Sequence, residues 1–297
     1  MQKKILVIGS SNTDMVVRTD AFPQPGETVL GGTFLMNPGG KGANQAVAAA
    51  RLGANVRFIT KTGTDIFGQQ AQEGFIKEGI DMAYLATTKE FASGVALITV
   101  NKNGENEIVV ASGANMDLRA ADLPDVVFEN VTLVLIQLEI PMETVRYVLK
   151  KCKELGIKAV LNPAPAAKLD DEILDGLYLI TPNETETQII TGTLPADENS
   201  RKKAAAYFLS KGVENVIITL GKAGVYLKNH ESDQIIPSLP VQAVDSTAAG
   251  DVFNGALVTA LSQDKNWVQA CEYACQAAAI SVTRLGAQSS APYEHEL

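Results

Sequence analysis

Histidine and cysteine are scarce in this sequence, which has two histidines and three cysteines among its 297 residues. His230 and His295 are too few for a histidine-based metal centre. Cys152, Cys271 and Cys275 form no Cys-x-x-Cys pair, and the last two share the face of an expected helix, as small buried hydrophobic residues do. We therefore expect neither a zinc site nor thiol redox chemistry.

Long apolar runs and clusters of basic residues are missing as well. No run approaches the roughly 18 apolar residues of a membrane-spanning helix, and the N-terminal apolar run is far too short for a signal peptide. We therefore expect a cytoplasmic protein. The net charge of −9, without a basic patch or tail, argues against a nucleic-acid partner. Nucleotide binding is still compatible with this charge, because backbone amides and Mg²⁺ supply positive potential locally.

Two common nucleotide-binding fingerprints are also absent. The apolar run Ile5–Ile8 leads into a turn, but Gly9 is followed by Ser, Ser and Asn rather than by the Gly-x-Gly-x-x-Gly pattern of dinucleotide-binding proteins. Lys41 lies in a glycine-rich segment, but not in the Gly-x4-Gly-Lys-Ser/Thr order of a Walker A loop. These absences disfavour a dehydrogenase and a P-loop enzyme.

Short apolar runs alternate with helical patterns along most of the chain. With 46% apolar residues the chain can bury a large core, as one α/β domain with an addition or as two domains. The alternation predicts an α/β fold, with a central, mostly parallel sheet covered by helices on both faces. The expected strands are 4–9, 56–60, 131–137, 158–162, 177–181 and 215–220, and the main expected helices are 42–52, 67–78, 142–154, 201–211, 251–262 and 267–283.

Four extended segments, at 15–17, 27–34, 94–100 and 107–110, have no helices to cover them. Turn residues separate the first two, and Asn101-Lys102-Asn103-Gly104 is a hairpin signal between the last two. We predict a small antiparallel sheet that projects from the core as a lid. The expected core comprises residues 1–13, 36–92 and 111–297, and the expected lid comprises residues 14–35 and 93–110. Because a bare apolar sheet face is a liability in water, we expect a homodimer that pairs lid to lid.

The segment Val244–Ala256 is the most informative for function. A run of small residues leads into Asp251, and a helical pattern follows at once. Small side chains at a helix N-terminus leave several backbone N–H groups exposed, and together with the helix dipole these groups form a site for an anion, typically phosphate. For this stretch alone, an ordinary capped helix after a flexible turn is the favoured interpretation. Asp251 is nevertheless placed to contact whatever attacks a bound phosphoryl group, which indicates phosphoryl transfer.

A second segment, Asn37–Gly53, supports this interpretation. Three glycines within residues 39–42 let the backbone approach a ligand closely, and Lys41 and Asn44 offer hydrogen-bond donors. An alanine-rich helical pattern follows, without a bulky residue until Leu52.

Four pieces of the chain occur in a characteristic order and spacing. They are Asn12-Thr13-Asp14, Pro38-Gly39-Gly40-Lys41-Gly42-Ala43-Asn44, Thr181-Pro182-Asn183-Glu184-Thr185-Glu186 and Asp245-Ser246-Thr247-Ala248-Ala249-Gly250-Asp251. With them the chain resembles the ribokinase-like carbohydrate kinases, from Ile5 to Pro292. The resemblance implies an ATP-dependent kinase that phosphorylates D-ribose at O5, giving ribose 5-phosphate and ADP. It also implies a β-sheet lid, which keeps water from the nucleotide.

The resemblance further implies roles for individual residues. Asp251 would be the catalytic base, and the amides of Ala248, Ala249 and Gly250 would form an anion hole for the transferred phosphoryl group. The sugar would contact Asn12, Thr13, Asp14, Gly40, Lys41, Gly42, Ala43, Asn44, Glu139 and Asp251. The plainer alternatives are a capping Asp14, a solvated Lys41 and a surface Glu139 before Pro141.

The same resemblance implies nucleotide and cation sites. Asn183 and Glu186 form an Asn-x-x-Glu element that would hold Mg²⁺ largely through water, although both can equally cap a helix. ATP would contact Asn183, Thr219, Leu220, Gly221, Lys222, Ala223, Gly224, Gly250 and Asp251, with Cys275 near the adenine. Asp245, Thr247, Ser281, Arg284, Gly286 and Ser290 match positions that surround K⁺ in the family, mostly through backbone carbonyls.

Three alternatives remain open from sequence. A sugar-binding protein without catalysis would have no use for Asp251 or Asn183, and a test for ADP release would separate it from a kinase. A dehydrogenase would have to bind NAD. Within the kinases, the substrate could be another furanose or a nucleoside, such as deoxyribose, fructose or pseudouridine.

Overall fold

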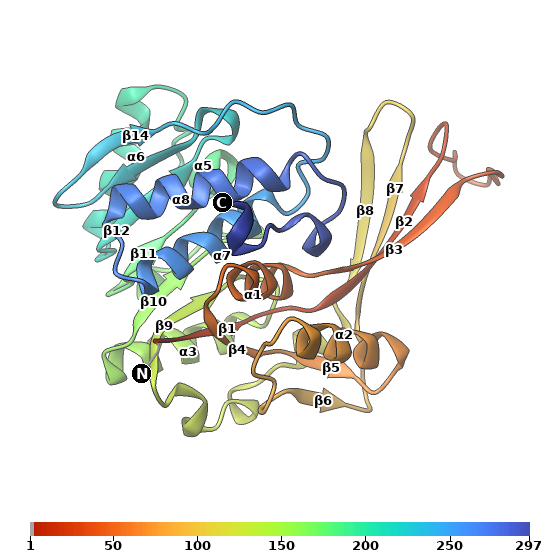
Figure 1. Cartoon of the computed structure of the whole chain (residues 1–297), viewed down its shortest axis with the longest axis horizontal. Helices are drawn as coiled ribbons and strands as arrows, with labels where there is room; N and C mark the ends of the chain where they lie inside the picture. The colour runs from red at the N-terminus through yellow and green to blue at the C-terminus, as the bar shows by residue number, and fades with distance from the viewer. Residues whose placement is uncertain (1–2) are drawn as a thin grey trace.

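An eight-stranded sheet lies at the centre of residues 3–297, which the computed structural model describes (Figure 1). The strand order is β14-β13-β12-β11-β10-β9-β1-β4. The strands from β12 to β4 pair in parallel, and β13 and β14 are added antiparallel at one edge. The strands are β1 (Lys4–Ile8), β4 (Asn55–Ile59), β9 (Val131–Ile136), β10 (Lys158–Leu161), β11 (Leu179–Ile180), β12 (Asn215–Thr219), β13 (Val225–Lys228) and β14 (Asp233–Ile236).

Helices cover both faces of this sheet and enclose one hydrophobic core on each side. The first core contains residues of α1 (Lys41–Arg51), α2 (Ile66–Lys77), α7 (Ala249–Ser262) and α8 (Trp267–Ser281). The second contains residues of α3 (Met142–Leu155), α4 (Asp171–Leu174), α5 (Glu184–Thr191) and α6 (Glu198–Ser210). Side chains of β1 alternate between the two cores, and this is why such strands read as continuous apolar runs. The predicted α/β fold with a mostly parallel, doubly covered sheet is confirmed.

Short elements complete the core. β5 (Lys61–Gly63) and β6 (Ala86–Thr88) pair in parallel beside the main sheet. The 3-10 helices are Gly113–Asp117, Ala120–Asp122, Asp125–Phe128, Gly221–Ala223, Gln288–Ser290 and Glu294–Glu296. Within residues 3–297, no helix is long and apolar enough to span a membrane.

Helices α1 and α7 pack against each other through small residues. A Cβ atom added at Gly255 of α7 would lie 2.7 Å from the Cβ of Ala48 and 2.7 Å from the carbonyl oxygen of Gln45, both in α1. Contacts this short leave no room for a side chain, so the two helix backbones are as close as glycine allows. The close approach keeps the N-terminal ends of α1 and α7 at a fixed separation.

A second sheet, with strand order β3-β2-β7-β8 in the described chain, projects from the core (Figure 1). Its strands are β2 (Asn12–Arg18), β3 (Thr33–Gly39), β7 (Gly94–Val100) and β8 (Asn106–Ala111). The outer pairs β2–β3 and β7–β8 are antiparallel, as predicted. The central pair β2–β7 is parallel, because both strands run outward from the core and β3 and β8 return to it. We call these four strands the lid sheet.

The structure differs from the expected strands at β3 and in two pairs that were not predicted, β5–β6 and β13–β14. The segment predicted to be extended at 27–34 forms a strand only from Thr33, and β3 continues to Gly39. Its Pro38 is tolerated because β3 is an edge strand, where a proline removes no required ladder hydrogen bond. The antiparallel pair β13–β14 was not predicted at all, since its strands have four residues each and follow the glycine-rich segment 221–224.

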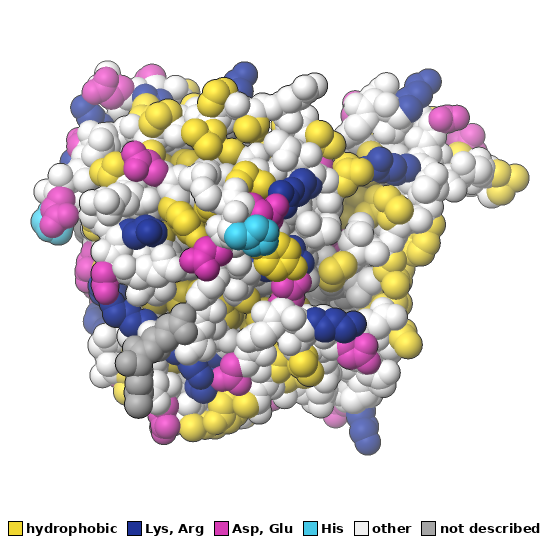
Figure 2. All heavy atoms as spheres, viewed as in Figure 1, with side chains coloured by type: hydrophobic (Ala, Val, Ile, Leu, Met, Phe, Trp, Pro, Cys, Tyr) yellow, Lys and Arg dark blue, Asp and Glu magenta, His cyan; other side chains and the backbone are white. Residues whose placement is uncertain are grey.

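The two faces of the lid sheet have different neighbours. Side chains of Asp14, Val16 and Arg18 point to one face, where they line a hollow of about 880 Å³ between the lid sheet and the core. Alternation places Val17 and its cross-strand neighbour Phe34 on the opposite face. Large apolar side chains on that face are exposed, and Figure 2 shows hydrophobic side chains gathered over this part of the molecule. They are Val17, Phe34, Met36, Leu97 and Val109.

Candidate active site

Polar residues follow the apolar strands at the carboxyl edge of the central sheet. Ser10 follows β1 after one glycine, Gln137 and Glu139 follow β9, and Asn162 follows β10. In a parallel sheet these positions meet at one edge, which is where open α/β folds bind ligands. The N-terminus of α1 lies at the same edge, since the Ala43 N–H donates to the Ser10 carbonyl at 2.9 Å.

The first turn of α7 presents unpaired backbone N–H groups at this edge. Its N-cap, Ala248, has a φ of 58°, a left-handed conformation that costs an alanine roughly 1–2 kcal/mol. Among the described residues, the N–H groups of Ala248, Gly250 and Asp251 have no hydrogen-bond partner, whereas that of Ala249 donates to the Ser246 carbonyl at 3.2 Å. Of the three amides expected in the anion hole, Ala249 is therefore already engaged.

The Asp251 side chain is buried in this turn, with 5% of the residue exposed. The Asn44 amide donates to one carboxylate oxygen and the Gln45 amide to the other, each at 2.9 Å. Burial raises the pKa of Asp251, while Lys41 and the two amides favour the charged form and oppose the rise. A fixed carboxylate beside free N–H groups has the features of a general base next to an anion site.

Lys41 is the first residue of α1, an unfavourable place for a cation at the positive end of the helix dipole. Gly40 precedes it as N-cap with a φ of 89°, and a Cβ atom there would lie 2.7 Å from the Asn12 amide nitrogen. Burial alone would lower the pKa of Lys41, but the neighbouring carboxylates of Asp251, Glu139, Glu186 and Asp14 raise it. These four carboxylates therefore stabilise the charged form of Lys41.

Asp14 and Glu139 are two of the carboxylates that surround Lys41. One Glu139 oxygen accepts hydrogen bonds from the Ser10 hydroxyl at 2.5 Å and from the Lys41 backbone N–H at 3.0 Å. Burial, together with the charges of Glu139 and Asp251, raises the pKa of Asp14 to about 6. A surface lysine and surface acids do not account for these positions, because half-buried groups of both signs converge on one spot.

Other predicted sugar contacts are placed less directly. Asn12 is buried, and its Oδ1 accepts a hydrogen bond from Asn115 Nδ2 at 2.7 Å, which leaves its own Nδ2 as the remaining donor. Thr13 points to the opposite face of β2 from Asp14, so the structure does not bring its side chain to the cluster. The Ala43 side chain is fully buried in the first core.

Most of the predicted nucleotide residues follow the carboxyl ends of β11 and β12, whereas Gly250 and Asp251 lie in α7. Asn183 and Glu186 form a reciprocal capping box at the start of α5, with hydrogen bonds of 2.8 and 2.9 Å. The Thr219 N–H donates to the Pro182 carbonyl at 2.9 Å, which places the segment 219–224 beside Asn183. Cys275 lies in α8, where 4% of the residue is exposed.

Burial raises the pKa of Glu186 to about 7. Lys41 opposes this rise and Asp251 adds to it, so Glu186 lies within electrostatic range of the cluster around the base. A buried carboxylate of this kind is stabilised by a nearby cation. In residues 3–297 no group of three or more His, Cys, Asp or Glu side chains is arranged to hold a metal ion. Both Glu186 oxygens accept hydrogen bonds from Asn183, and carboxylate and amide oxygens are of the kind that Mg²⁺ prefers, either directly or through water.

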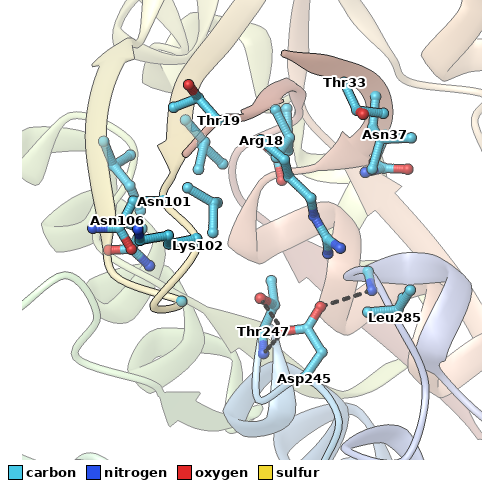
Figure 3. A pocket seen from close by; sticks show the side chains of 18 of the residues that line it. Arg18, Thr19, Thr33, Asn37, Asn101, Lys102, Asn106, Asp245, Thr247 and Leu285 are labelled. Carbon is cyan, nitrogen blue, oxygen red and sulfur yellow. Dashed lines mark hydrogen bonds between the residues drawn. The ribbon is translucent and has the colours of Figure 1, made fainter. Parts of the chain in front are cut away.

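Asp245 joins the two segments of the predicted K⁺ site. Its carboxylate accepts hydrogen bonds from the Thr247 N–H and hydroxyl, at 2.9 and 2.6 Å, and from the Gly286 N–H at 2.9 Å. These bonds outweigh partial burial and hold the pKa of Asp245 below its usual value. Figure 3 shows the Arg18 side chain extending from the lid sheet toward Asp245 across the hollow.

The remaining predicted K⁺ ligands follow in the segment 281–290. The Arg284 guanidinium turns away to Glu296, with a contact of 2.6 Å, so this residue has its backbone carbonyl to offer. The hydroxyls of Ser281 and Ser290 donate to backbone carbonyls at 2.8 Å and keep oxygen lone pairs free. Carboxylate, hydroxyl and carbonyl oxygens form a donor set that suits a hard cation.

Sequence reasoning missed several polar residues of the site. They are Ser10, Gln45, Asn115, Gln137 and Asn162, all at most 6% exposed and all hydrogen-bonded to predicted site residues or to one another. A signal was present for three of them. Gln137 and Asn162 stand directly after apolar runs and Ser10 one residue later, where the carboxyl end of a buried strand was expected.

The chain is similar to carbohydrate kinases over nearly its whole length. Residues 2–294 match the model of the "pfkB family carbohydrate kinase". A ribokinase of Haemophilus influenzae is 47% identical over 298 residues, covering 100% of this chain and 97% of the relative. A deoxyribokinase of Salmonella typhi is 38% identical over 292 residues, covering 97% of this chain and 95% of the relative.

A solved structure supports the same relationship. The structure of Arabidopsis thaliana ribokinase complexed with ribose and ATP superposes with a TM-score of 0.92 at 30% sequence identity, covering 99% of this chain and 97% of that chain. Lid sheet and core are both included in an alignment of that extent.

Proposed function

The chain belongs to the pfkB family of carbohydrate kinases, and from this premise we propose that it transfers the γ-phosphoryl group of ATP to O5 of D-ribose. The observation that carries the proposal is the Asp251 carboxylate, fixed by two side-chain amides beside unpaired N–H groups at the start of α7. The ribokinase relatives, at 47% identity and below, support ribose as the sugar.

The sugar would lie between the lid sheet and the N-terminus of α1. Asp14, Glu139 and the Asn12 amide offer acceptors and a donor for its hydroxyls, and Lys41 offers a cation. Asn44 would contact the sugar while it holds Asp251. Convergent charged groups that are half-buried before the substrate binds are preorganised for hydrogen bonds to several hydroxyls.

Phosphoryl transfer then needs few protein groups. The sugar oxygen O5 forms a bond to the γ-phosphorus, the bond between that phosphorus and the bridging oxygen breaks, and ADP leaves with the electron pair. Asp251 takes the hydroxyl proton, which need not leave early in a loose transition state. The Gly250 and Asp251 N–H groups, with the dipole of α7, stabilise charge on the transferred group.

ATP would lie along the segment 219–224 and the start of α5, with its adenine toward α8 near Cys275. Asn183 and Glu186 would hold Mg²⁺ largely through water, and the ion supplies positive charge beside the phosphates. We further propose that K⁺ binds between the loop of Asp245 and Thr247 and the segment 281–290. An ion there would order the loop that leads into α7 without touching ATP.

A homodimer through the lid sheet is the third element of the proposal. Its support is the exposure of large apolar side chains on both faces, including 67% for Val109 on one face and 53% for Ile108 on the other. Apolar surface of this extent is buried in most soluble proteins, and a second lid sheet is a complementary cover.

The decisive experiment is a panel of sugars and nucleosides assayed for ADP release with ATP and Mg²⁺. Ribose should give the highest kcat/KM. Deoxyribose should be poorer by roughly ten- to a hundredfold, because a site built to bind the 2-hydroxyl is left with unpaired polar groups at ~1–3 kcal/mol each. A higher kcat/KM for deoxyribose, fructose or pseudouridine would leave the kinase assignment intact and overturn the ribose assignment.

Deoxyribose is the second candidate, because a deoxyribokinase is 38% identical to this chain over nearly its whole length. The Asn12 amide favours ribose over it. Asn115 accepts the Ser11 N–H and binds the Asn12 oxygen, so the Asn12 Nδ2 is presented as a donor that needs a sugar oxygen as partner.

A further inference from the structure

Buried amide side chains form a hydrogen-bonded chain behind Asp251. Gln45 and Gln137 are fully buried, and Asn162 is 6% exposed. Gln45 donates to the Asp251 Oδ1 and to the Asn162 Oδ1, each at 2.9 Å, and its own Oε1 accepts from Gln137 Nε2 at 2.5 Å. Both hydrogens and the oxygen of the Gln45 amide are therefore used, so the amide has one orientation.

The chain continues and returns to α7. Asn162 donates to the Thr181 carbonyl at 3.1 Å, and the Thr181 hydroxyl donates to the Asn254 Oδ1 at 2.6 Å. Asn254 in turn donates to the carbonyl of Gly250 at 2.8 Å. The bonds thus begin at Asp251 and end at the residue before it, and they tie the first turn of α7 to the carboxyl ends of β10 and β11.

Packing does not require a glutamine at this position. Gln45 lies on the buried side of α1 among alanines, such as Ala43, Ala46 and Ala48, where an apolar residue needs no partner. Burying an amide costs about 1–3 kcal/mol unless its groups are paired. A buried amide with every group paired, one of them to a carboxylate, is better explained by the orientation that it imposes on that carboxylate.

We propose that Gln45 is a positioning residue for Asp251. A carboxylate oxygen accepts two hydrogen bonds in its plane, and Gln45 and Asn44 each occupy one position on opposite oxygens. Each oxygen therefore keeps a second acceptor position, and the sugar hydroxyl would bind at one of these positions. Gln137 and Asn162 fix Gln45 in turn. The proposal rests on the proposed function, in which Asp251 is the base.

The test begins with Gln45→Met, which keeps the length of the side chain and removes the donor. We expect kcat to fall roughly ten- to a hundredfold, because a misplaced catalytic group loses about that much. The KM values for ribose and ATP should stay within a few-fold. The acidic limb of the kcat–pH profile should move to higher pH, since a hydrogen bond that favours the charged form of Asp251 is lost.

A matched control is Asn215→Leu. Asn215 is a buried amide at the opposite edge of the sheet, where it donates to the Tyr178 carbonyl and accepts from Asn229. Its loss should lower the melting temperature and leave kcat and the pH profile unchanged. If Gln45→Met does not fold, Gln45→Glu preserves the shape and replaces the donor by an acceptor. In that variant a still larger upward shift of the acidic limb is expected.

A double-mutant cycle with Asp251→Asn separates the two proposals. If Gln45 acts through the base, Gln45→Met should change kcat less than about threefold in the Asp251→Asn background. An equal loss in both backgrounds, or an unshifted pH profile, would overturn the positioning role. Substantial activity of Asp251→Asn alone would instead overturn the assignment of the base.

Discussion

Asp14→Asn should make the ligand-free protein more stable and a poorer enzyme. Burial and neighbouring acids raise the pKa of Asp14 from 3.8 to about 6 in the folded chain. A raised pKa means that ionisation costs free energy in the folded state. The stabilising effect of the neutral form is complete below the unfolded pKa and is lost as the pH rises through the folded pKa.

The size of the gain follows from the shift. A pKa shift of roughly two units, at about 1.4 kcal/mol each, means that ionised Asp14 destabilises the fold by about 3 kcal/mol when the pH is above 7. At pH 5 the destabilisation is about half as large. An asparagine has nearly the same shape and no charge, so it avoids this penalty. We therefore expect Asp14→Asn to have a higher free energy of unfolding in urea than the parent protein. This difference should be about 1.5 kcal/mol larger at pH 8 than at pH 5.

Asp197 offers a control of opposite sign. It caps α6, and the Ser200 backbone N–H lowers its pKa, so the parent protein gains stability when Asp197 ionises. Asp197→Asn should therefore become less stable relative to the parent as the pH rises from acid to neutral. The KM of the Asp14→Asn variant for ribose should also be roughly ten- to a hundredfold higher than that of the parent, because a hydrogen bond to a charged acceptor is worth about 1.5–3 kcal/mol. A stability difference that stays constant between pH 5 and pH 8 would refute the reasoning.

Three further predictions concern catalysis, the cation and assembly. Asp251→Asn should lower kcat by roughly 10²–10⁴-fold with sugar affinity within a few-fold, and retention of more than about a tenth of kcat would rule out a general base. Activity should be higher in K⁺ than in Na⁺ or tetramethylammonium buffers, and equal rates in all three would count against the cation site. The protein should sediment as a dimer that at least one of Leu97→Glu and Ile108→Glu, on opposite faces of the lid sheet, converts to a monomer. A monomeric parent, or two dimeric variants, would contradict assembly through the lid sheet.

The central sheet could be predicted because both of its faces are buried. A strand such as β1 shows four consecutive apolar residues, Ile5–Ile8, and the six parallel strands fall within one or two residues of the expected ranges. The strands of the lid sheet were harder to predict, because most of their residues are not buried in a core. The shift of β3 toward Gly39 could not be read from sequence, because the strand is positioned by its pairing with β2.

The site divides in the same way. Motif residues such as Asp14, Lys41 and Asp251 were predicted, and the structure brings them into one charged cluster. Their roles stay predictions until ligands are measured. The amides behind them were missed, because the part played by Gln45 depends on which side of α1 meets α7, and that of Asn115 on the return of β8 to the core. Such contacts arise from tertiary packing and leave no local pattern.

The close contact of α1 and α7 through Gly255 has an evolutionary consequence. Lys41 and Asp251 lie in the first turns of these two helices, so the close contact holds the proposed base and the lysine at a fixed separation. Asn12 and Asp14 belong instead to β2, which continues into the lid sheet. If these residues hold the sugar as proposed, substitutions in β2 would alter which sugar binds and would leave the contact between α1 and α7 intact. Under the proposed function, descendants of this chain would acquire new acceptors through changes in the lid sheet, with the contact between α1 and α7 inherited unaltered.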